Sequence, residues 1–121
     1  MTSSRQTLGD LGESAAAGYL RRLGWEILDR KHRSPAGEID IVARDRESVV
    51  FIEVRTRSSD AFGTPEESIT AAKARRMLRC AMLYIGAHPD LATDWRIDVV
   101  TVRVGPDRVV NVSHYRNAVE S

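Results

Sequence analysis

The stretch GEIDIVARDRESVVFIEVRTR, residues 37–57, contains two short runs rich in Val and Ile, a composition typical of β-strands. The runs cover residues 38–43 and 49–54, and a polar segment separates them. Two such runs joined by a short polar segment predict a β-hairpin. The hairpin is unusual because acidic side chains, among them Asp40 and Glu53, lie inside its strands.

The register of this hairpin decides which side chains share a face. Pairing of Arg44 with Val49 across a short loop places Asp40 opposite Glu53, and directly opposed residues have Cβ atoms about 4.5–5.5 Å apart. One face then carries the charged side chains Glu38, Asp40, Glu53 and Arg55. The other face carries apolar side chains that we expect to pack under a helix: Ile39, Ile41, Ile52 and Val54.

The segment before the hairpin predicts a helix and a first strand. Apolar residues at spacings of three and four predict a helix over residues 8–23, with Thr7 as its N-cap. Residues 25–28 have the composition of a strand. A basic cluster at 30–33 and a turn at 34–37 then connect this strand to the hairpin.

The segment after the hairpin predicts a second helix and a second hairpin. A capping box at 64–67, or a fresh start at Thr70, precedes the helix. Alternating residues then predict strands over 95–104 and 109–112, with Asp98 as an acid of open role. The element order is therefore α-β-β-β-α-β-β, which predicts an α/β fold with a mixed β-sheet flanked by helices.

The composition is that of a soluble globular protein. The chain has 121 residues, 42% hydrophobic and 29% charged, so we expect one domain over residues 1–121. The single cysteine and the lack of a targeting or long apolar segment predict a cytoplasmic protein without a membrane partner. Eighteen basic and 17 acidic residues leave a formal charge of +1, which indicates neither a polyanionic partner nor its absence.

The paired carboxylates are the chemical feature of the hairpin. Asp40 and Glu53, with Glu13 of the first helix as a third carboxylate, form an oxygen-rich set suited to Mg²⁺ or Mn²⁺. Such an ion assists phosphodiester hydrolysis, and Arg55 adds positive charge beside the reacting phosphate. The spacing alone leaves two other interpretations open: solvent-facing acids of an ordinary hairpin, and a retaining glycosidase pair ~5–5.5 Å apart.

Three segments carry a resemblance to a known family: LGESAA at 11–16, GEIDIV at 37–42 and VFIEVRTR at 50–57. They resemble the YraN-type family of small uncharacterised bacterial proteins, and the resemblance extends to residues 96–100. That family is regarded as predicted endonucleases related to archaeal Holliday-junction resolvases. The resemblance therefore implies a restriction-endonuclease-like fold and an endonuclease acting on DNA, including branched or damaged structures.

The motif of that fold is an acid on one strand, then an acid, any residue and lysine on the next, often with a glutamate from the first helix. The resemblance implies that Asp40, Glu53 and Glu13 bind Mg²⁺ or Mn²⁺ and form the catalytic set with Arg55, and that Glu38 supports them. Arg55 departs from the motif, because lysine usually holds this position and arginine does not act as a base. The rival function is a non-catalytic nucleic-acid-binding module of the same fold.

Basic residues around the hairpin are candidates for nucleic-acid binding. We expect phosphate contacts from Arg30, Lys31, Arg33, Arg57, Lys73 and Arg76. The alternative for the helical residues among them is an ordinary solvated helix face. The resemblance also implies a homodimer, because relatives with this fold often dimerise to provide two sites for the two strands.

Overall fold

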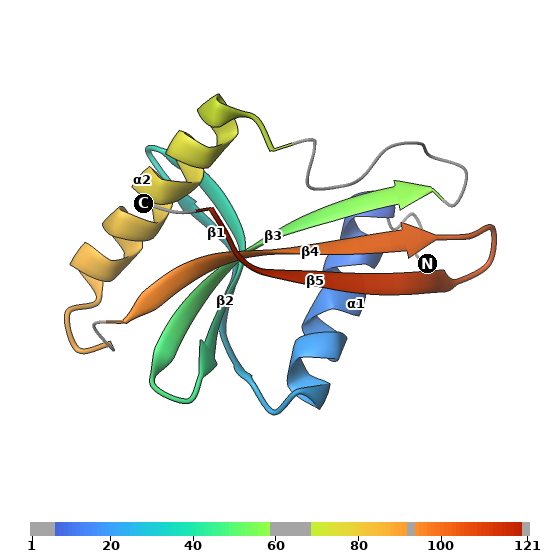
Figure 1. The fold of residues 1–121 in the computed structure, drawn as a ribbon, viewed down its shortest axis with the longest axis horizontal. Helices are drawn as coiled ribbons and strands as arrows, with labels where there is room; N and C mark the ends of the chain where they lie inside the picture. Colours follow the sequence, from blue (N-terminus) through green and yellow to red (C-terminus); the bar gives the residue numbers. More distant parts are fainter. Residues whose placement is uncertain (1–6, 59–68, 92–93, 120–121) are drawn as a thin grey trace, which may run out of the picture.

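A computed structural model describes residues 7–58, 69–91 and 94–119 of the chain (Figure 1). Its elements, in chain order, are α1 (Leu8–Arg22), β1 (Glu26–Ser34), β2 (Gly37–Asp45), β3 (Ser48–Ser58), α2 (Ala71–Ala87), β4 (Trp95–Val104) and β5 (Val109–Val119). The predicted order α-β-β-β-α-β-β is confirmed.

The strands of the described residues form one mixed sheet in the order β1-β2-β3-β4-β5. Strands β3 and β4 are parallel, whereas the other neighbouring pairs are antiparallel. A parallel pair needs a crossover connection, and α2 lies in that connection between β3 and β4. The predicted α/β class is confirmed, and the arrangement is consistent with a restriction-endonuclease-like fold.

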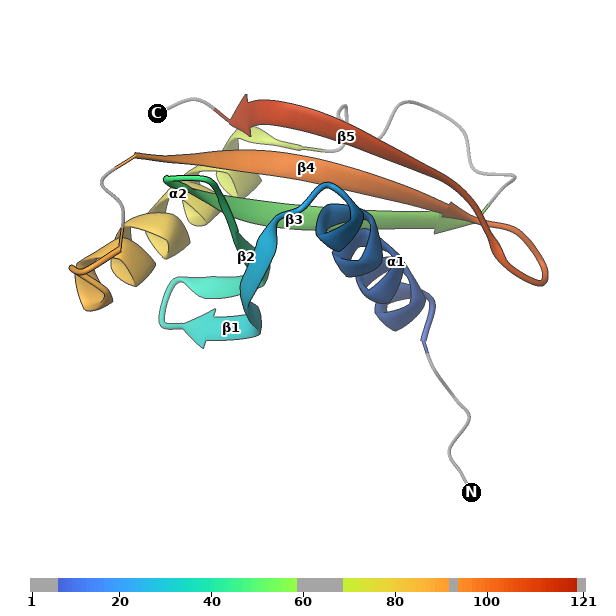
Figure 2. The same ribbon diagram turned by 90° about the horizontal axis from the view of Figure 1, so that it is seen from below.

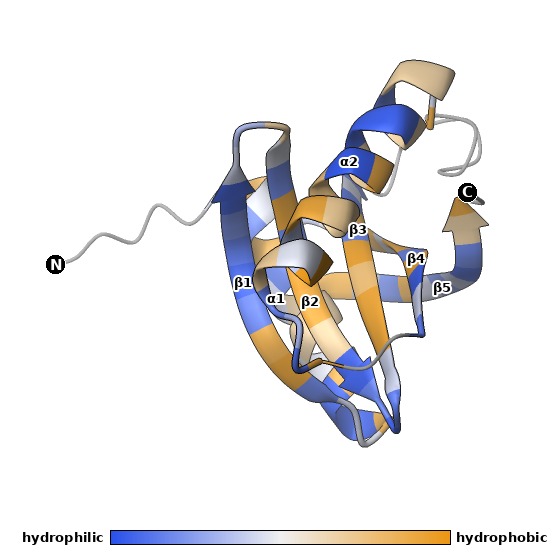
Figure 3. Ribbon diagram, turned by 90° about the vertical axis from the view of Figure 1, so that its left-hand side faces the viewer, coloured by the Kyte–Doolittle hydropathy of each residue, from blue (hydrophilic) through white to orange (hydrophobic). Residues whose placement is uncertain are grey.

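The two helices cover opposite faces of the sheet. On β3, Val50 and Ile52 pack in one hydrophobic cluster with α1, whereas Val49 and Phe51 pack in the other cluster with α2. Figure 1 shows α1 behind β4 and β5, and Figure 2 shows the same helix in front of the sheet. Figure 3 shows hydrophobic residues gathered on β2 and β3 and hydrophilic ones along the edge strand β1. The inner strands are thus buried on both sides.

The predicted register of the β2–β3 hairpin is confirmed. Arg44 pairs with Val49, as the sequence analysis requires. The ladder continues to Asp45 and Ser48, so the turn is shorter than expected. Arg46 in this turn has φ 59°, the left-handed conformation that a tight hairpin turn uses.

One residue predicted for the apolar face lies on the opposite face. Ile41 packs in the α1 cluster as expected, but Ile39 packs in the α2 cluster. The pairing of β2 with β3 ends where Ile41 meets Ile52, and beyond that point β2 pairs with β1 alone among the described strands. There Lys31 of β1 has φ 52°, which breaks the regular strand geometry beside Asp40. The change of face at Ile39 therefore coincides with the end of the β2–β3 ladder and with the irregular geometry of β1 at Lys31.

Four strands are longer than predicted: β2 and β3 extend beyond residues 38–43 and 49–54, and β1 and β5 extend furthest. β1 continues through the basic cluster 30–33 to Ser34, and β5 continues past residue 112 to Val119. Pairing with a neighbouring strand stabilises these polar segments in extended form, against their weak local propensity. The basic cluster therefore lies on an edge strand rather than in a loop.

Both helices begin at threonine caps. Thr7 Oγ1 accepts a hydrogen bond from the Asp10 N–H at 3.0 Å, as predicted. Thr70 Oγ1 accepts one from the Lys73 N–H at 3.2 Å, which confirms the fresh start of the second helix. The alternative capping box at 64–67 lies outside the described residues. Within the described ranges, neither helix has the length and hydropathy needed to cross a membrane.

Helix α1 approaches β3 closely through Gly12. A Cβ atom at this position would overlap the side chain of Thr56, so only glycine allows the contact. The contact brings the next residue, Glu13, against the end of β3. Glu13 is accordingly buried, with 4% of its surface exposed.

Candidate active site

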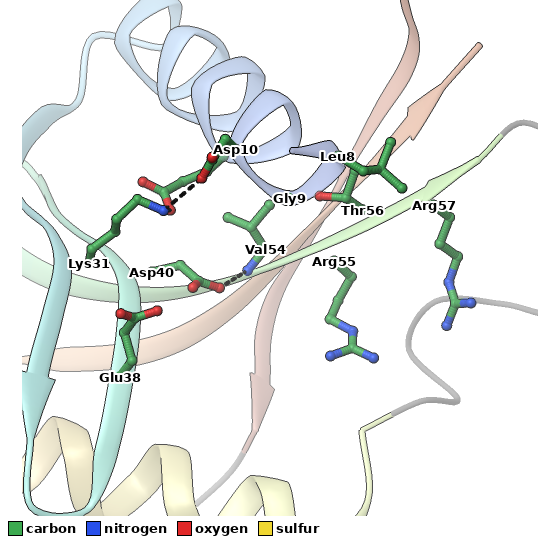
Figure 4. A pocket seen from close by; sticks show the side chains of 11 residues that line it. Leu8, Gly9, Asp10, Lys31, Glu38, Asp40, Val54, Arg55, Thr56 and Arg57 are labelled. Carbon is green, nitrogen blue, oxygen red and sulfur yellow. Dashed lines mark hydrogen bonds and ion pairs between the residues drawn. The ribbon is translucent and has the colours of Figure 1, made fainter. Parts of the chain in front are cut away.

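Strand β3 extends beyond its pairing with β2, and its free edge forms a pocket. β3 continues beside β4 as far as Ser58. The cavity measures about 420 Å³ and is lined by the first turns of α1, by Lys31, by the start of β2 and by residues 54–57 (Figure 4). We call it the carboxylate pocket because four acidic residues line it: Asp10, Glu13, Glu38 and Asp40.

At this free edge, the side chain of Asp40 takes the place of a backbone acceptor from a neighbouring strand. Its Oδ2 accepts a hydrogen bond of 2.8 Å from the backbone N–H of Val54, drawn as a dashed line in Figure 4. Burial and the negative charge of Glu53, with smaller effects of Glu13 and Glu38, raise the pKa of Asp40 to about 7. A carboxyl group that titrates near neutral pH is common in functional sites.

Glu53 lies on the α2 face of β3, together with Arg55. Its side chain is 11% exposed, and its Oε2 is 3.5 Å from Nη1 of Arg55. It lines a hollow that includes Glu38 and Met77 of α2. The regular β2–β3 ladder ends at Ile41 and Ile52, one pair before Asp40 and Glu53, but the negative charge of Glu53 still contributes to the raised pKa of Asp40.

Glu13 reaches the same pocket from α1, but cations of the chain already neutralise it. Its Oε1 accepts a hydrogen bond of 2.9 Å from Nε of Arg30, and its Oε2 is 3.0 Å from Nζ of Lys31. Lys31 also contacts Asp10 at 3.1 Å, and hydrogen bonds with Glu13 and Asp10 raise the pKa of Lys31. Arg30 and Lys31, both predicted to contact phosphate, therefore contact acids of the pocket instead.

Asp10 is a pocket residue that the sequence analysis did not single out. Hydrogen bonds from Lys31 and from Thr7 hold the pKa of its carboxyl group below the usual value. The available signal was its place three residues after the N-cap, where an acid interacts favourably with the helix dipole. That signal indicates helix stabilisation and says nothing about a pocket.

The carboxylate oxygens of Asp40 and Glu53 are ligands of the kind that Mg²⁺ and Mn²⁺ prefer. Among the described residues, no set of three or more His, Cys, Asp or Glu side chains is grouped to hold a metal ion. Mg²⁺ commonly uses one or two carboxylates and keeps several waters, so two acids meet its needs. The raised pKa of Asp40 fits a site in which a cation would relieve repulsion. The full set with Glu13 stays a prediction.

Of the other residues predicted for phosphate contacts, Arg57 is among the described residues that line the pocket, and Arg33, Lys73 and Arg76 are not. Arg33 is 86% exposed and its Nε is 3.3 Å from Oε2 of Glu38. Arg57 lines the pocket, whereas Lys73 lies in the first turn of α2. Arg76 packs against the backbone of Gly37, where its side chain leaves little room for a Cβ atom.

Asp98 lies outside the carboxylate pocket, fully buried on the α1 side of the sheet. Its Oδ1 accepts hydrogen bonds from Nε of Arg96 at 3.0 Å and from the backbone N–H of Asn117 at 2.8 Å. Its Oδ2 is 2.8 Å from Nε2 of His114, and the other ring nitrogen of His114 is 3.0 Å from Tyr19 Oη on α1. This network connects β4, β5 and α1. Asp98, whose role the sequence left open, therefore stabilises the fold.

Comparison with known proteins finds relatives of nearly the same length. The sequence model described as "Uncharacterised protein family UPF0102" matches residues 12–102. A UPF0102 protein of Roseiflexus castenholzii is 50% identical, covering 99% of this chain and 98% of the relative. UPF0102 proteins of Moorella thermoacetica and Chloroflexus aurantiacus are 46% and 42% identical, each covering 98% of this chain. The matched region spans 99% of the Moorella protein and 98% of the Chloroflexus protein.

Proposed function

Since this chain belongs to the uncharacterised protein family UPF0102, a name that assigns no activity, we propose its function from the carboxylate pocket. The proposal is a divalent-metal-dependent endonuclease that hydrolyses phosphodiester bonds in DNA, including branched or damaged structures. Asp40 and Glu53 would hold Mg²⁺ or Mn²⁺, and Glu13 is a third ligand if Arg30 and Lys31 move away from it.

One observation carries the proposal. The fold keeps Asp40 partly buried and near Glu53, Glu13 and Glu38, although this placement raises the pKa of Asp40 to about 7. Like charges in a buried site destabilise a fold unless a cation compensates them. An acidic cluster of ordinary surface residues would relax into solvent, whereas Asp40 is held at the strand edge by its hydrogen bond from the Val54 N–H.

The pocket also supplies groups for a phosphodiester. A bound Mg²⁺ or Mn²⁺ would polarise the phosphate and lower the pKa of an attacking water. Arg55 lies beside Glu53 and would stabilise the negative charge that develops on the phosphate. Arg57 lines the pocket one alternate position further along β3, where it is suited to a neighbouring phosphate.

Cleavage by the Glu53→Gln variant tests the function directly. The purified protein is incubated with linear, single-stranded and four-way-junction DNA in Mg²⁺, in Mn²⁺ and in EDTA. We expect cleavage of at least one substrate with either ion, none in EDTA, and a rate about 10²- to 10³-fold lower for Glu53→Gln, because a key charge is lost.

The matched control for this assay is Glu47→Gln. Glu47 is exposed in the β2–β3 turn, outside the carboxylate pocket, so its variant should cleave at the wild-type rate. Equal cleavage by wild type and Glu53→Gln would indicate a contaminating nuclease. No cleavage of any substrate by the wild type in either ion would reject the nuclease proposal.

A second function, a non-catalytic nucleic-acid-binding module, is favoured by the ion pairs of the pocket. Arg55 contacts Glu53, and Arg30 and Lys31 contact Glu13, so cations of the chain already compensate two of the acids. A site that has lost its metal would keep such internal compensation. In this case DNA binding would persist in EDTA and cleavage would be absent.

An Arg55→Lys variant distinguishes the two functions. Lysine keeps the positive charge and can exchange a proton with water, which arginine cannot do at a pKa above 12. We expect the cleavage rate to rise by about tenfold, at the low end of general acid–base effects. Activity that appears only in this variant would support the binding module as the native function. A rate that falls as far as in Arg55→Ala would instead show that the planar guanidinium group is needed.

A further inference from the structure

The α2 side of the sheet carries a second polar surface beyond the carboxylate pocket. On β3, Arg55 and Arg57 follow Glu53 at alternate positions and therefore share its face. In the parallel β3–β4 register, Arg57 is the partner of Arg103. In Figure 1 this end of β3, β4 and β5 faces the viewer, and neither described helix lies in front of it.

Arg57 and Arg103 are like charges at partnered positions of adjacent strands. Such a pair is destabilising unless a negative group neutralises it. The Nε atom of Arg57 is also buried, and no described group accepts a hydrogen bond from it. A buried donor without a partner costs free energy and calls for an explanation. Both observations are accounted for by an anion that binds between the two arginines.

The surroundings of the two arginines are suited to an anion. They line a cavity of about 80 Å³ together with Thr101, Asn111, Ser113 and Tyr115. Each of these side chains has a hydroxyl or amide group that can donate a hydrogen bond. None of the described residues that line this cavity is acidic, in contrast to the carboxylate pocket. We call it the Arg57–Arg103 pocket.

We propose that the Arg57–Arg103 pocket binds a backbone phosphate of the nucleic-acid strand that enters the carboxylate pocket. The inference rests on the proposed function for this placement of the strand. Side chains at alternate positions on one face of a β-strand are about 6.6 Å apart, which is similar to the spacing of successive phosphates in an extended nucleic-acid strand. A strand that follows the row Glu53, Arg55 and Arg57 thus presents one phosphate to the acids and a later one to Arg57 and Arg103.

The test measures binding of a fluorescein-labelled single-stranded oligonucleotide by anisotropy in EDTA. Arg57→Gln and Arg103→Gln should each weaken binding roughly tenfold and lower the slope of log K against log salt by about 0.7. The control is Arg108→Gln, an exposed arginine near the β4–β5 turn that does not line the pocket. Wild-type binding by both pocket variants, or an equal loss in the control, would overturn the proposal.

Two further measurements separate binding from folding. Asn111→Asp adds a negative charge at an exposed position of the pocket without changing the size of the side chain, so it should weaken binding as much as losing an arginine. Arg103→Gln removes repulsion, so its unfolding midpoint should stay equal or rise while affinity falls. A midpoint that falls together with affinity would identify a structural arginine and contradict the proposal.

Competition identifies the source of the phosphate. Inorganic phosphate should displace the labelled oligonucleotide only at concentrations far above those at which an unlabelled oligonucleotide displaces it. Displacement at equal phosphate concentrations would identify a site for free phosphate and reject binding of a nucleic-acid backbone. Binding that depends on Arg57 and Arg103, without cleavage in Mg²⁺, would support phosphate binding by the Arg57–Arg103 pocket and reject nuclease activity. Cleavage with an unchanged KM in a variant that carries both Arg57→Gln and Arg103→Gln would support nuclease activity and reject phosphate binding by this pocket.

Discussion

Replacing Asp40 by asparagine is expected to lower DNA cleavage by about 10²- to 10³-fold while it raises the free energy of unfolding by up to about 4 kcal/mol at pH 8. Cleavage falls because the amide offers no negative charge to a divalent cation. Stability rises because burial and the charge of Glu53 disfavour the ionised carboxylate in the fold. The amide oxygen can still accept the hydrogen bond from Val54, so the strand edge stays intact.

The stability difference between the Asp40→Asn variant and the wild type should depend on pH. The pKa of Asp40 is about 7 in the fold, raised from the ordinary aspartate value of 3.8 that applies to the unfolded chain. The folded protein therefore binds this proton more tightly, and the wild type loses stability as pH rises from about 4 to about 7. Urea denaturation should give similar stabilities near pH 4 and a more stable variant at pH 8.

Mn²⁺ provides a control for the same experiment. At pH 8 it should stabilise the wild type, because an ion that binds only the folded state shifts the equilibrium toward it. The Asp40→Asn variant should show a much smaller response, and Glu47→Gln should respond like the wild type. If Asp40→Asn were less stable than the wild type without metal, the carboxylate would be a structural acceptor rather than a strained ligand.

Replacing Asp98 by alanine is expected to destabilise the protein by about 3–5 kcal/mol, the usual effect of removing one partner of a buried charged network. Asp98 is fully buried, and its loss leaves Arg96, His114 and the Asn117 N–H without their acceptor. Thermal denaturation should show a large fall in the midpoint. Asp90→Ala, at an exposed position beyond α2, is the control and should change the midpoint little.

The contribution of Asp98 should be lost in acid. Burial opposes ionisation, but hydrogen bonds from His114, Arg96 and Asn117 outweigh it and hold the pKa of Asp98 below 3.8. The stabilisation is therefore complete above the unfolded pKa and disappears as pH falls through the lower, folded pKa. The difference in free energy of unfolding between the wild type and Asp98→Ala should be constant from pH 5 to 8 and should shrink below pH 4. A difference that shrinks at neutral pH would contradict this assignment.

The local signals of the sequence predicted much of the fold. The alternation of the hairpin and the register of Arg44 with Val49 are confirmed, and so are the caps at Thr7 and Thr70. These features depend on residues that lie close together in the chain. The expectation that Asp40 and Glu53 are neighbours rests on the same register, but the ladder itself ends at Ile41 and Ile52, so their shared site stays a prediction.

Other features departed from the local pattern. Ile39 faces α2 because β2 separates from β3 beside Asp40, and a strict alternation carries no sign of that separation. The basic cluster at 30–33 is a strand because β2 supplies its hydrogen-bond partners. Asp98 is an acid in an apolar strand because the irregular pairing near Asn117 leaves a backbone N–H that needs an acceptor.

The sequence by itself determined the order of the elements, the register of the central hairpin and the family, since all three rest on short-range patterns and motifs. Only the tertiary structure showed that Glu13 is paired with Arg30 and Lys31, and that Arg57 lies beside Arg103. The physical reason is that these contacts join separate elements. Their distances depend on how α1 packs against the sheet and how β3 pairs with β4, and spacing along the chain does not encode either.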